Sequence, residues 1–256
     1  MKTILVTGSA GRLGQAAVQA FQKQKYRVIG LDCRPTPGLA SAVVDTLQNP
    51  VLLQEMMRGM DAVLHLAATP DDPVWPLPAD AGDNFLQELL PNNIVASYHI
   101  LEAARRAGVK KVILASSGQV VWEQSFHGPY PVRTDARPTP RWWYASTKVF
   151  LEVIGEAYAR QGYFHVIAAR LGFCPRDRSH IELIDQSERD QDVYLSPNDA
   201  GRFFVCCIEA ERPAGTFDLV YVTSKPLHQI RFDLEPAHRL LGYQPEESWP
   251  TGAERE

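Results

Sequence analysis

A tyrosine and a lysine lie four positions apart in "RWWYASTKVF", a short stretch of this 256-residue chain. The pattern predicts a helix over 143–161, and residues four apart on a helix share one face, so Tyr144 and Lys148 would be neighbours. An ammonium group close to a phenol favours the phenolate and lowers the phenol pKa, as a base that removes a proton from a substrate alcohol requires. The alternative is a core tyrosine beside a surface lysine, and the spacing alone does not decide between them.

Two serines could act with this pair. "LASSG" places Ser116 and Ser117 at the end of a predicted strand. The carboxyl ends of parallel strands form the ligand-binding edge of an open α/β sheet. A hydroxyl at this edge can donate a hydrogen bond to the substrate oxygen while a hydride leaves the carbon that carries it.

Three glycines in "ILVTGSAGRLGQAA" lie between a predicted strand and a predicted helix. Gly8 allows the tight turn, Gly11 lets a pyrophosphate approach the backbone, and Gly14 allows helix and strand to pack closely. The unpaired N–H groups and the positive dipole end of the helix would then face the phosphates. The GxxGxxG spacing is one residue wider at its start than the usual fingerprint, but its position at a strand-to-helix junction predicts a dinucleotide site.

An acidic residue follows eighteen positions after the last of these glycines. Asp32, at the end of "YRVIGLD", can accept hydrogen bonds from the adenosine ribose hydroxyls and repel a 2′-phosphate, which favours NAD over NADP. Arg34 is the counter-signal, because a nearby arginine can accommodate that phosphate. A further alternative is that Asp32 only caps a turn. On balance the sequence predicts NAD as the cofactor.

Short apolar runs alternate along the chain with segments of helical periodicity. The predicted buried strands are "KTILVT", "YRVIGL", "SAVV", "DAVLHLA", "KKVILAS" and "FHVIAAR". The predicted helices cover about 12–24, 48–59, 92–107 and 143–161. The third helix is expected to begin just after Pro91 and to end at Gly108. This β-α-β-α order predicts an α/β fold with a doubly wound parallel sheet, the Rossmann fold.

Three long segments interrupt this alternation, at 69–83, 127–141 and 173–192. The first two are rich in proline and aspartate, and all three follow strand ends. They would therefore emerge at the carboxyl edge of the sheet, where open α/β folds bind ligands. Loops of this length inside a compact domain are usually functional or disordered, so they are the expected source of substrate specificity.

The C-terminal part is short. "SPND" predicts a helix with Ser196 as N-cap and Pro197 at its first position, "TFDLVYVTS" predicts a strand, and "LEPAHRLLG" a final helix. We expect one NAD-binding domain over 1–256. Its small substrate-binding portion is expected mainly from 171–198 and 223–256.

Composition excludes some classes of protein. The chain has 45% hydrophobic and 22% charged residues and a net charge of −4, so neither a nucleic acid nor an anionic membrane is an expected partner. No apolar run approaches membrane-spanning length, and the first glycine comes too early for a signal peptide. Four cysteines without zinc or CxxC spacing are typical of a reducing, cytoplasmic protein, and no metal site is expected.

Five motifs in order point to a family. "TGSAGRLG", "LHLAA", "NNIVASYHILEAARRAG", "VILASSG" and "YASTK" together resemble the extended short-chain dehydrogenases/reductases, the NAD-dependent epimerase/dehydratase group. The resemblance covers residues 2–175, with a weaker match in "SPNDAGR" and "LLGYQP". It implies that Tyr144 is the catalytic base, that Lys148 tunes it and holds the nicotinamide ribose, and that Ser117 binds the reacting oxygen.

The same resemblance implies a set of cofactor contacts. The implied NAD-binding residues are Gly8, Gly11, Arg12, Leu13, Gly14, Asp32, Asp45, Thr46, Leu66, Ala67, Ala68, Asn93, Tyr144 and Lys148. Among them Asp45 would contact the adenine, and Asn93 would lie near the nicotinamide ribose.

Departures from the family's patterns narrow the reaction. The dehydratases of the group resemble one another in an Asp–Glu pair after the catalytic hydroxyl residue, where this chain has Gly118 and Gln119, so a dehydratase is not expected. Epimerases usually carry an aromatic–aromatic–Asn run after the sixth strand and a longer C-terminal region, and neither is present. "RLGFCP" and "DLEPAHRLLGYQP" are most similar to the hexuronate (uronate) dehydrogenases, which oxidise a free sugar acid at its anomeric carbon with NAD.

The fit to the uronate dehydrogenases is incomplete. A Gly–Gln pair replaces their Asn–His pair, and Phe173 stands where a small hydroxyl residue is implied. Gln119 could still hydrogen-bond a sugar hydroxyl, and Arg176 or Arg178 could bind a carboxylate bidentately with help from His180. The predicted substrate-binding residues are Gln119, Phe173 and Arg178. The alternative is a solvated loop whose arginines pair with its own acidic residues.

These patterns predict an NAD-dependent oxidoreductase that acts on a sugar or sugar acid. The alternatives are an NAD-dependent sugar epimerase, in which the cofactor never leaves, and a non-catalytic NAD-binding sensor. The helix "KVFLEVIGEAYA" carries a broad apolar stripe, part of which should pack on the sheet. In the resembling family such helices form a twofold dimer interface, so a homodimer is expected.

Overall fold

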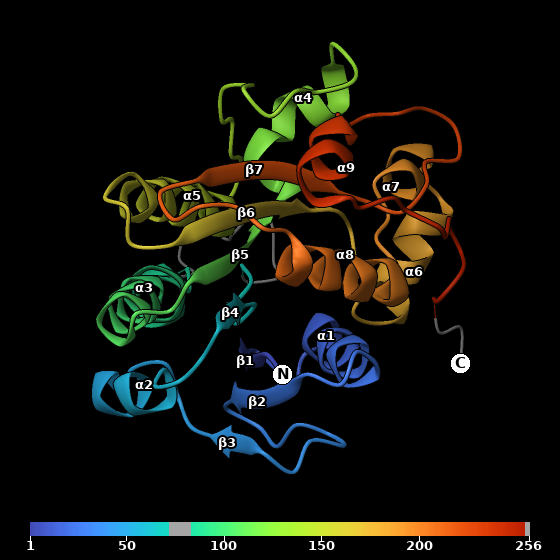
Figure 1. Ribbon diagram of the computed structural model, residues 1–256. Coiled ribbons are helices and arrows are strands. Elements are labelled where there is room, and N and C mark those ends of the chain that lie inside the picture. The colour runs from blue at the N-terminus through green and yellow to red at the C-terminus, as the bar shows by residue number, and fades with distance from the viewer. Residues whose placement is uncertain (72–82, 254–256) are drawn as a thin grey trace.

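A seven-stranded parallel sheet forms the centre of the molecule in the computed structural model, which describes residues 1–71 and 83–253 (Figure 1). The strands are β1 (Thr3–Thr7), β2 (Arg27–Asp32), β3 (Ala42–Val44), β4 (Ala62–His65), β5 (Lys111–Ser117), β6 (His165–Leu171) and β7 (Phe217–Val222). Their order is β3-β2-β1-β4-β5-β6-β7, and each neighbouring pair is parallel. The chain order reverses between β1 and β4, so the predicted doubly wound sheet is confirmed.

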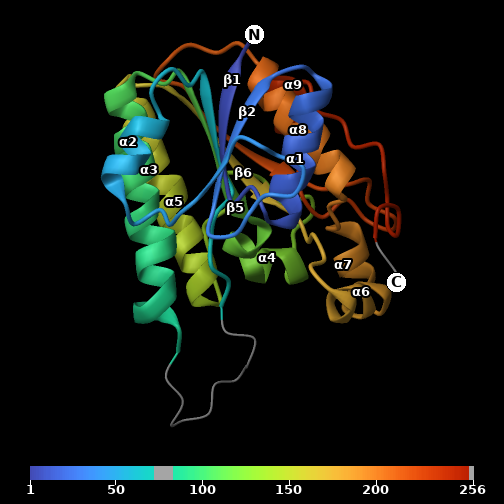
Figure 2. The same ribbon diagram turned by 90° about the horizontal axis from the view of Figure 1, so that it is seen from below.

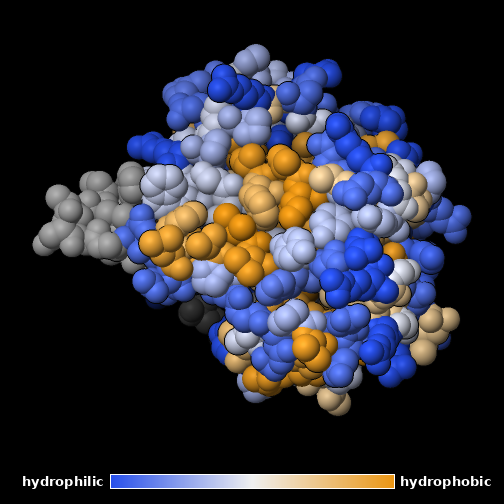
Figure 3. All heavy atoms as spheres, turned by 90° about the vertical axis from the view of Figure 1, so that its left-hand side faces the viewer, coloured by the Kyte–Doolittle hydropathy of each residue, from blue (hydrophilic) through white to orange (hydrophobic). Residues whose placement is uncertain are grey.

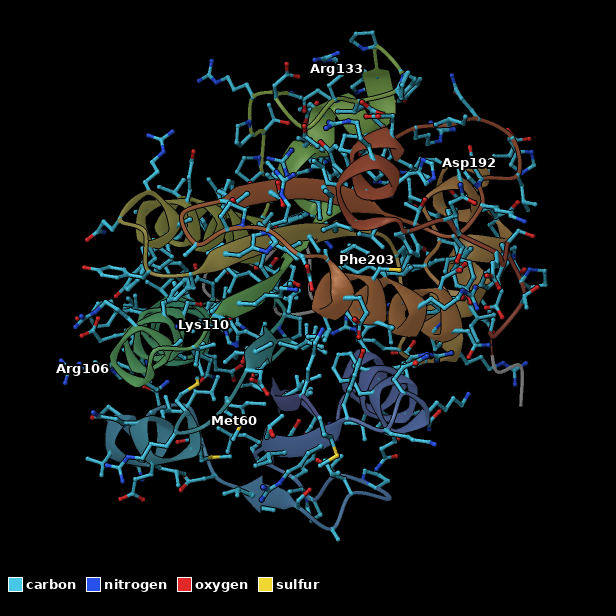
Figure 4. The ribbon with its side chains drawn as sticks, viewed as in Figure 1. Met60, Arg106, Lys110, Arg133, Asp192 and Phe203 are labelled. Carbon is cyan, nitrogen blue, oxygen red and sulfur yellow. The ribbon has the colours of Figure 1, made fainter. Side chains whose placement is uncertain are left out.

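Helices cover both faces of this sheet. They are α1 (Arg12–Lys23), α2 (Pro50–Met56), the π-helical η1 (Phe85–Val95), α3 (Ala96–Ala107), the 3-10 helix η2 (Gly118–Val121), α4 (Trp122–His127), α5 (Trp143–Arg160), α6 (Arg178–Asp185), α7 (Glu188–Asp192), α8 (Pro197–Glu209) and α9 (Glu235–Leu241). α2, α3 and α5 lie on one face and α1 and α8 on the other (Figure 2). Phe203 of α8 is buried between its helix and the sheet (Figure 4). Two apolar cores, one on each face, therefore hold the strands in place.

The helix ends follow local chemistry. The Oγ of Ser196 accepts a hydrogen bond of 3.0 Å from the N–H of Asp199, and Pro197 occupies the first position of α8, as predicted. Gly108 ends α3 in the left-handed conformation with φ of 70°, also as predicted. Both ends were therefore readable from residue type.

The predicted start of the third helix was wrong. The helical segment begins at Phe85, with Pro91 inside the π-helical η1, and continues without a break into α3. A proline ring inside an α-helix clashes with the carbonyl group one turn earlier, and the wider π turn relieves this clash. Proline therefore did not mark a helix start here.

The sequence predicted a long loop over 173–192, but the structure shows two short helices in this segment. It contains α6 and α7, whose N-caps Asp177 and Ser187 accept hydrogen bonds from backbone N–H groups three residues later. Ile184 of α6 is fully buried in a small separate core. Of the other two segments, residues 72–82 lie outside the described part of the chain, while 128–141 is largely irregular.

Candidate active site

A cavity of about 850 Å³ opens at the carboxyl edge of the sheet, where the chain order reverses. It is lined by residues that follow β1, β4, β5 and β6, together with the start of α5. The predicted site residues that line it are Gly8, Gly11, Arg12, Leu13, Gly14, Leu66, Ala68, Ser117, Gln119, Tyr144, Lys148 and Phe173. Residues from five separate regions of the sequence thus meet in one space.

The glycine loop leaves no room for side chains. Gly8 has φ of +71°, and a Cβ atom there would lie 2.7 Å from the backbone nitrogen of Ala67. A Cβ on Gly14 would lie 2.1 Å from the carbonyl oxygen of Gly8. α1 then begins at Arg12, and its N-cap Gly11 has no side chain to satisfy the first N–H groups. The loop and helix end therefore fit the pyrophosphate of a dinucleotide.

Asp32 lies at the carboxyl end of β2, beside this loop. Its Oδ2 accepts a hydrogen bond of 3.0 Å from the N–H of Ala10, and its Oδ1 accepts one of 3.1 Å from the N–H of Arg34. The Arg34 side chain is 70% exposed, and its Nε lies 4.0 Å from the carboxylate. The carboxylate is thus the group held in place, and Arg34 is the looser one.

Five of the predicted cofactor contacts lie outside the cavity lining: Asp32, Asp45, Thr46, Ala67 and Asn93. Asp45 follows β3, and its N–H donates to the carbonyl oxygen of Asp32, so it is close to the predicted ribose site. Asn93 is buried and connects two parts of the structure. Its Oδ1 accepts from the N–H of Thr69, and its Nδ2 donates to the hydroxyl of Thr147 on α5. These bonds connect η1 to the helix that carries Tyr144.

The predicted catalytic side chains come together around the cavity. Tyr144 and Lys148 lie on successive turns of α5, and the Lys148 Nζ is 5.2 Å from the centre of the tyrosine ring. The same Nζ donates a 2.8 Å hydrogen bond to the carbonyl oxygen of Ala115 on β5. Ser117 ends β5, and its Oγ accepts a hydrogen bond from the N–H of Gln119. Hydroxyl, phenol and ammonium groups thus converge from two elements.

Burial is the main influence on the phenol of Tyr144. Burial raises the pKa of Tyr144 to about 12, while Arg176 lowers this pKa and Asp71 raises it. Burial also lowers the pKa of Lys148 to about 8. The lowering of the phenol pKa by Lys148 therefore stays a prediction, and burial and the charges of Arg176 and Asp71 are the influences that act on Tyr144 in this structure. The phenol is protonated at neutral pH, and the positive charge of an oxidised nicotinamide would favour its ionisation.

The sequence missed Asp71, which lies in the cavity lining. Its Oδ1 accepts a 2.8 Å hydrogen bond from the N–H of Tyr144, which satisfies a free donor in the first turn of α5. Burial raises the pKa of this carboxyl group, the Tyr144 hydrogen bond lowers it, and Asp83 raises it. The only signal in the sequence was an aspartate in a polar segment after a strand.

Aromatic side chains form one wall of the cavity. The ring of Trp122 lies 4.9 Å from that of Phe126 and 6.0 Å from that of Trp142. Two arginines stack on these rings: Arg141 lies 5.1 Å from the centre of Trp142, and Arg189 lies 4.4 Å from that of Phe126. The sequence did not indicate either arginine, and for Arg189 the reason is that only folding brings α7 against α4.

Two arginines of the segment after β6 occupy different settings. Arg176 lines the cavity, and its N–H donates to the Nδ1 of His180, whose ring lies 5.3 Å from that of Phe173. The Arg178 side chain is 79% exposed, pairs with Glu182 at 3.2 Å, and is not in the lining. For Arg178 the structure thus favours the solvated alternative, because its position on α6 directs it along the helix surface.

Within residues 1–71 and 83–253, no group of histidine, cysteine, aspartate and glutamate side chains could hold a metal ion. None of the described helices is long and apolar enough to span a bilayer.

Comparison with known proteins agrees with this architecture. The model of the NAD dependent epimerase/dehydratase family matches residues 4–174. The chain is similar to L-arabinose 1-dehydrogenase (NAD(P)(+)) of Haloferax volcanii, at 27% identity over 99% of this chain and 100% of the relative. It is also similar to uronate dehydrogenase of Pseudomonas syringae pv. tomato, at 27% identity over 66% of this chain and 58% of the relative.

A solved structure shares the fold. A mutant uronate dehydrogenase from Agrobacterium tumefaciens complexed with NAD superimposes with a TM-score of 0.74, at 20% identity, over 96% of this chain and 85% of that one. This likeness extends beyond the family match into the C-terminal part of the chain.

Proposed function

This chain belongs to the NAD dependent epimerase/dehydratase family, and we propose that it oxidises a free sugar or sugar acid with NAD as the hydride acceptor. The observation that carries the proposal is the convergence of Ser117, Tyr144 and Lys148 on one cavity that also contains the glycine loop. In this assignment the hydroxyl of Ser117 donates to the substrate oxygen. The ionised Tyr144 takes the hydroxyl proton, and Lys148 holds the nicotinamide ribose.

A charged or polyhydroxylated substrate fits the remaining wall of the cavity. Arg176 supplies a guanidinium group there, and burial and Arg176 together lower the pKa of His180, so this imidazole is neutral near pH 7. Gln119 adds a polar amide side chain and Phe173 an apolar surface. The names of the relatives, an arabinose and a uronate dehydrogenase, support a free sugar or sugar acid. We propose Arg176, rather than Arg178, as the group that binds a substrate carboxylate.

The substrate-binding portion is proposed to combine 171–198 with 223–256. Phe173, Arg176 and His180 from the first segment and Phe232 from the second line the same cavity. A substrate would therefore contact both segments.

The test is to incubate the purified protein with NAD and a panel of free uronates, neutral aldoses and nucleotide sugars, and to follow nicotinamide absorbance. Net NADH formation with a free sugar or sugar acid is expected. A sugar epimerase would instead invert a substrate while its cofactor stays bound without net reduction. No turnover of any substrate, with NAD still bound, would favour a sensor and overturn the proposal.

Two variants sharpen the carboxylate assignment. Arg176→Ala should raise KM for a sugar acid about tenfold to a hundredfold, because a charge-assisted contact is lost, and should leave KM for a neutral aldose within about twofold. Arg178→Ala should leave both KM values within about twofold. The reverse pattern would transfer the role to Arg178.

We also propose a homodimer formed through α3 and α5. Exposed apolar side chains lie on this side of the molecule, which Figure 3 shows, and they include Tyr98 of α3 and Val153 of α5, the latter 62% exposed. Sedimentation analysis should find a dimer that Val153→Glu converts to a monomer.

A cytoplasmic location is proposed because all four cysteines are free thiols.

A further inference from the structure

We propose that Glu152 is a positioning residue: together with Ser116 and Arg170 it locks the helix of Tyr144 and Lys148 onto the sheet and so sets the geometry of hydride transfer. This inference rests on the proposed function. The three side chains are buried, with exposures of 6%, 2% and 2% for Glu152, Ser116 and Arg170. None of them is needed to bind NAD or substrate in the assignment above.

The carboxylate of Glu152 is held by donors from two adjacent strands. Its Oε1 accepts from the Oγ of Ser116 on β5 at 2.5 Å and from the Nε of Arg170 on β6 at 2.9 Å. Its Oε2 accepts from the Nη2 of Arg170 at 2.9 Å. Ser116 and Arg170 are partners in the β5–β6 register, so the carboxylate is bound by two side chains that lie next to each other on adjacent strands. Such a bidentate pair defines orientation as well as distance.

The hydrogen-bond network continues from β6 to β7. Arg170 is also the register partner of Tyr221 on β7, and its Nη1 donates to the Tyr221 hydroxyl at 2.8 Å. That hydroxyl donates to the carbonyl oxygen of Arg133, in the loop after α4 (Figure 4). The Nη1 of Arg170 also donates to the carbonyl oxygen of Thr134. The network therefore connects α5 with β5, β6, β7 and the loop that leads to α5.

The register of the helix gives this network its catalytic consequence. Tyr144, Lys148 and Glu152 follow at intervals of four residues, so they lie along one face of α5. Lys148 bonds to Ala115, and Glu152, one turn further, bonds to the next residue of β5. Ser117 follows directly. A slide or rotation of α5 would move the phenol relative to Ser117, and two bonds one turn apart resist both motions.

A contrast at the other end of β6 separates positioning from mere stability. His165, at the amino end of β6, lies with its Nε2 2.8 Å from the Oδ2 of Asp218 on β7, and both side chains are buried. That pair also joins neighbouring strands, but within the described residues neither side chain forms a hydrogen bond or ion pair with α5. Asp218 is therefore a matched control for Glu152.

The first experiment compares Glu152→Gln with Asp218→Asn in the full-length protein. Both variants should lower Tm. Glu152→Gln should also lower kcat by at least about tenfold while the dissociation constant for NAD changes by less than about threefold, because misplacement of the reacting groups affects the chemical step. Asp218→Asn should leave kcat within about twofold. Equal losses of kcat in the two variants would overturn the proposal.

A double variant removes the charges without leaving one unpaired. Glu152→Leu combined with Arg170→Met should recover most of the lost Tm, since apolar replacement of a whole buried ion pair is often neutral or stabilising. Its kcat should stay at least about tenfold low, because the hydrogen bonds from Glu152 to both Ser116 and Arg170 are gone and α5 is no longer tied to β5 and β6. Ser116→Ala, which keeps the ion pair, should lower kcat less than Glu152→Gln does. Recovery of kcat together with Tm would make the network structural only.

A second readout does not need turnover. The phenol pKa of Tyr144, measured by ultraviolet titration as the difference from matched Tyr144→Phe proteins, should shift by about half a unit or more in the charge-neutral double variant and remain unchanged in Asp218→Asn. If no substrate of the panel is oxidised, the proposed function fails while this titration still tests the positioning. An unshifted phenol would refute the positioning even in an active enzyme.

Discussion

The two edges of the sheet carry similar side chains with different consequences. At the carboxyl edge Lys148 donates to one backbone carbonyl group, and at the amino edge the Nζ of Lys111 donates to the carbonyl oxygens of Cys207, Ile208 and Ala210. Burial lowers the pKa of each lysine to about 8. Lys110, just before β5, and Asp192, on α7 beyond the other edge, lie on opposite sides of the molecule (Figure 4).

The difference lies in what surrounds each lysine. The amino edge has a cavity of about 490 Å³ lined by charged and small or apolar residues, whereas the carboxyl edge adds a phenol, two serines and a glycine loop. At the amino edge all three donors of Lys111 are used to satisfy the end of α8, which is a structural task. A buried lysine with a lowered pKa is therefore not a sufficient sign of a catalytic site.

The largest difference between the edges should appear on removal of the phenol. Tyr144→Phe should lower kcat by about a thousandfold, the scale of a lost general acid–base group, with unchanged NAD affinity. Tyr158→Phe removes the hydroxyl of another tyrosine on α5, which donates to Glu102 away from the cavity, and should leave kcat within about twofold. Steady-state kinetics with the substrate found in the panel would decide, and a fully active Tyr144→Phe protein would exclude the proposed mechanism.

The paired lysines test the comparison directly. Lys148→Met should lower kcat by about a hundredfold. Lys111→Met should leave kcat within about twofold but lower the free energy of unfolding by about 1 kcal/mol, because three carbonyl oxygens lose their donor. Kinetics and urea unfolding on both proteins separate the two effects. A loss of kcat in Lys111→Met would show that the edges are coupled.

Two aspartates provide a smaller contrast. Asp32 at the carboxyl edge accepts from the N–H of Ala10, and Asp61 at the amino edge accepts from the N–H of Thr3 at 2.7 Å. Asp32→Asn should reduce the preference for NAD over NADP about tenfold, because the repulsion of a 2′-phosphate is lost. Asp61→Asn should not alter this preference. Ratios of kcat/KM with the two cofactors are the measurement.

The smallest expected effect is on stability against pH. The folded pKa of Lys148 is about 8 and its ordinary value is 10.5, so between these values the unfolded chain binds more protons and this lysine makes the folded state more stable as pH rises. The free energy of unfolding of the parent minus that of Lys148→Met should therefore become more positive from pH 8 to pH 10. Lys111→Met should show the same trend more weakly, because Lys111 is less buried. A flat difference for Lys148 would show that its folded pKa is not lowered.

Local signals in the sequence were sufficient for much of the fold. The β-branched runs predicted all seven strands, and Ser196 and Gly108 marked helix ends correctly. Pro91 misled because a π turn accepted it, and the two short helices after β6 were missed because their caps stood in a charged segment. Such short helices depend on buried contacts, as Ile184 makes, rather than on periodicity.

The candidate site likewise contains residues that the sequence indicated and residues that it did not. The types and spacing of Ser117, Tyr144, Lys148 and the glycines were readable, because hydride-transfer chemistry and a pyrophosphate site need those residues at those intervals. Asp71 and Arg189 were not readable, since each lies far along the chain from the groups it faces. The same holds for the contact between Glu152 and Arg170, whose spacing of eighteen residues matches no local repeat.

By itself, the sequence determined the sheet, its order of elements, the cofactor loop and the helix that carries Tyr144 and Lys148. These features follow from short-range propensity, periodicity and turn chemistry, which act within a few residues. Only the tertiary structure decided which side chains face the cavity, that burial raises the phenol pKa, and that Arg176 rather than Arg178 lines the site. Burial and charge proximity are properties of the packed chain, and they arise between residues distant in sequence.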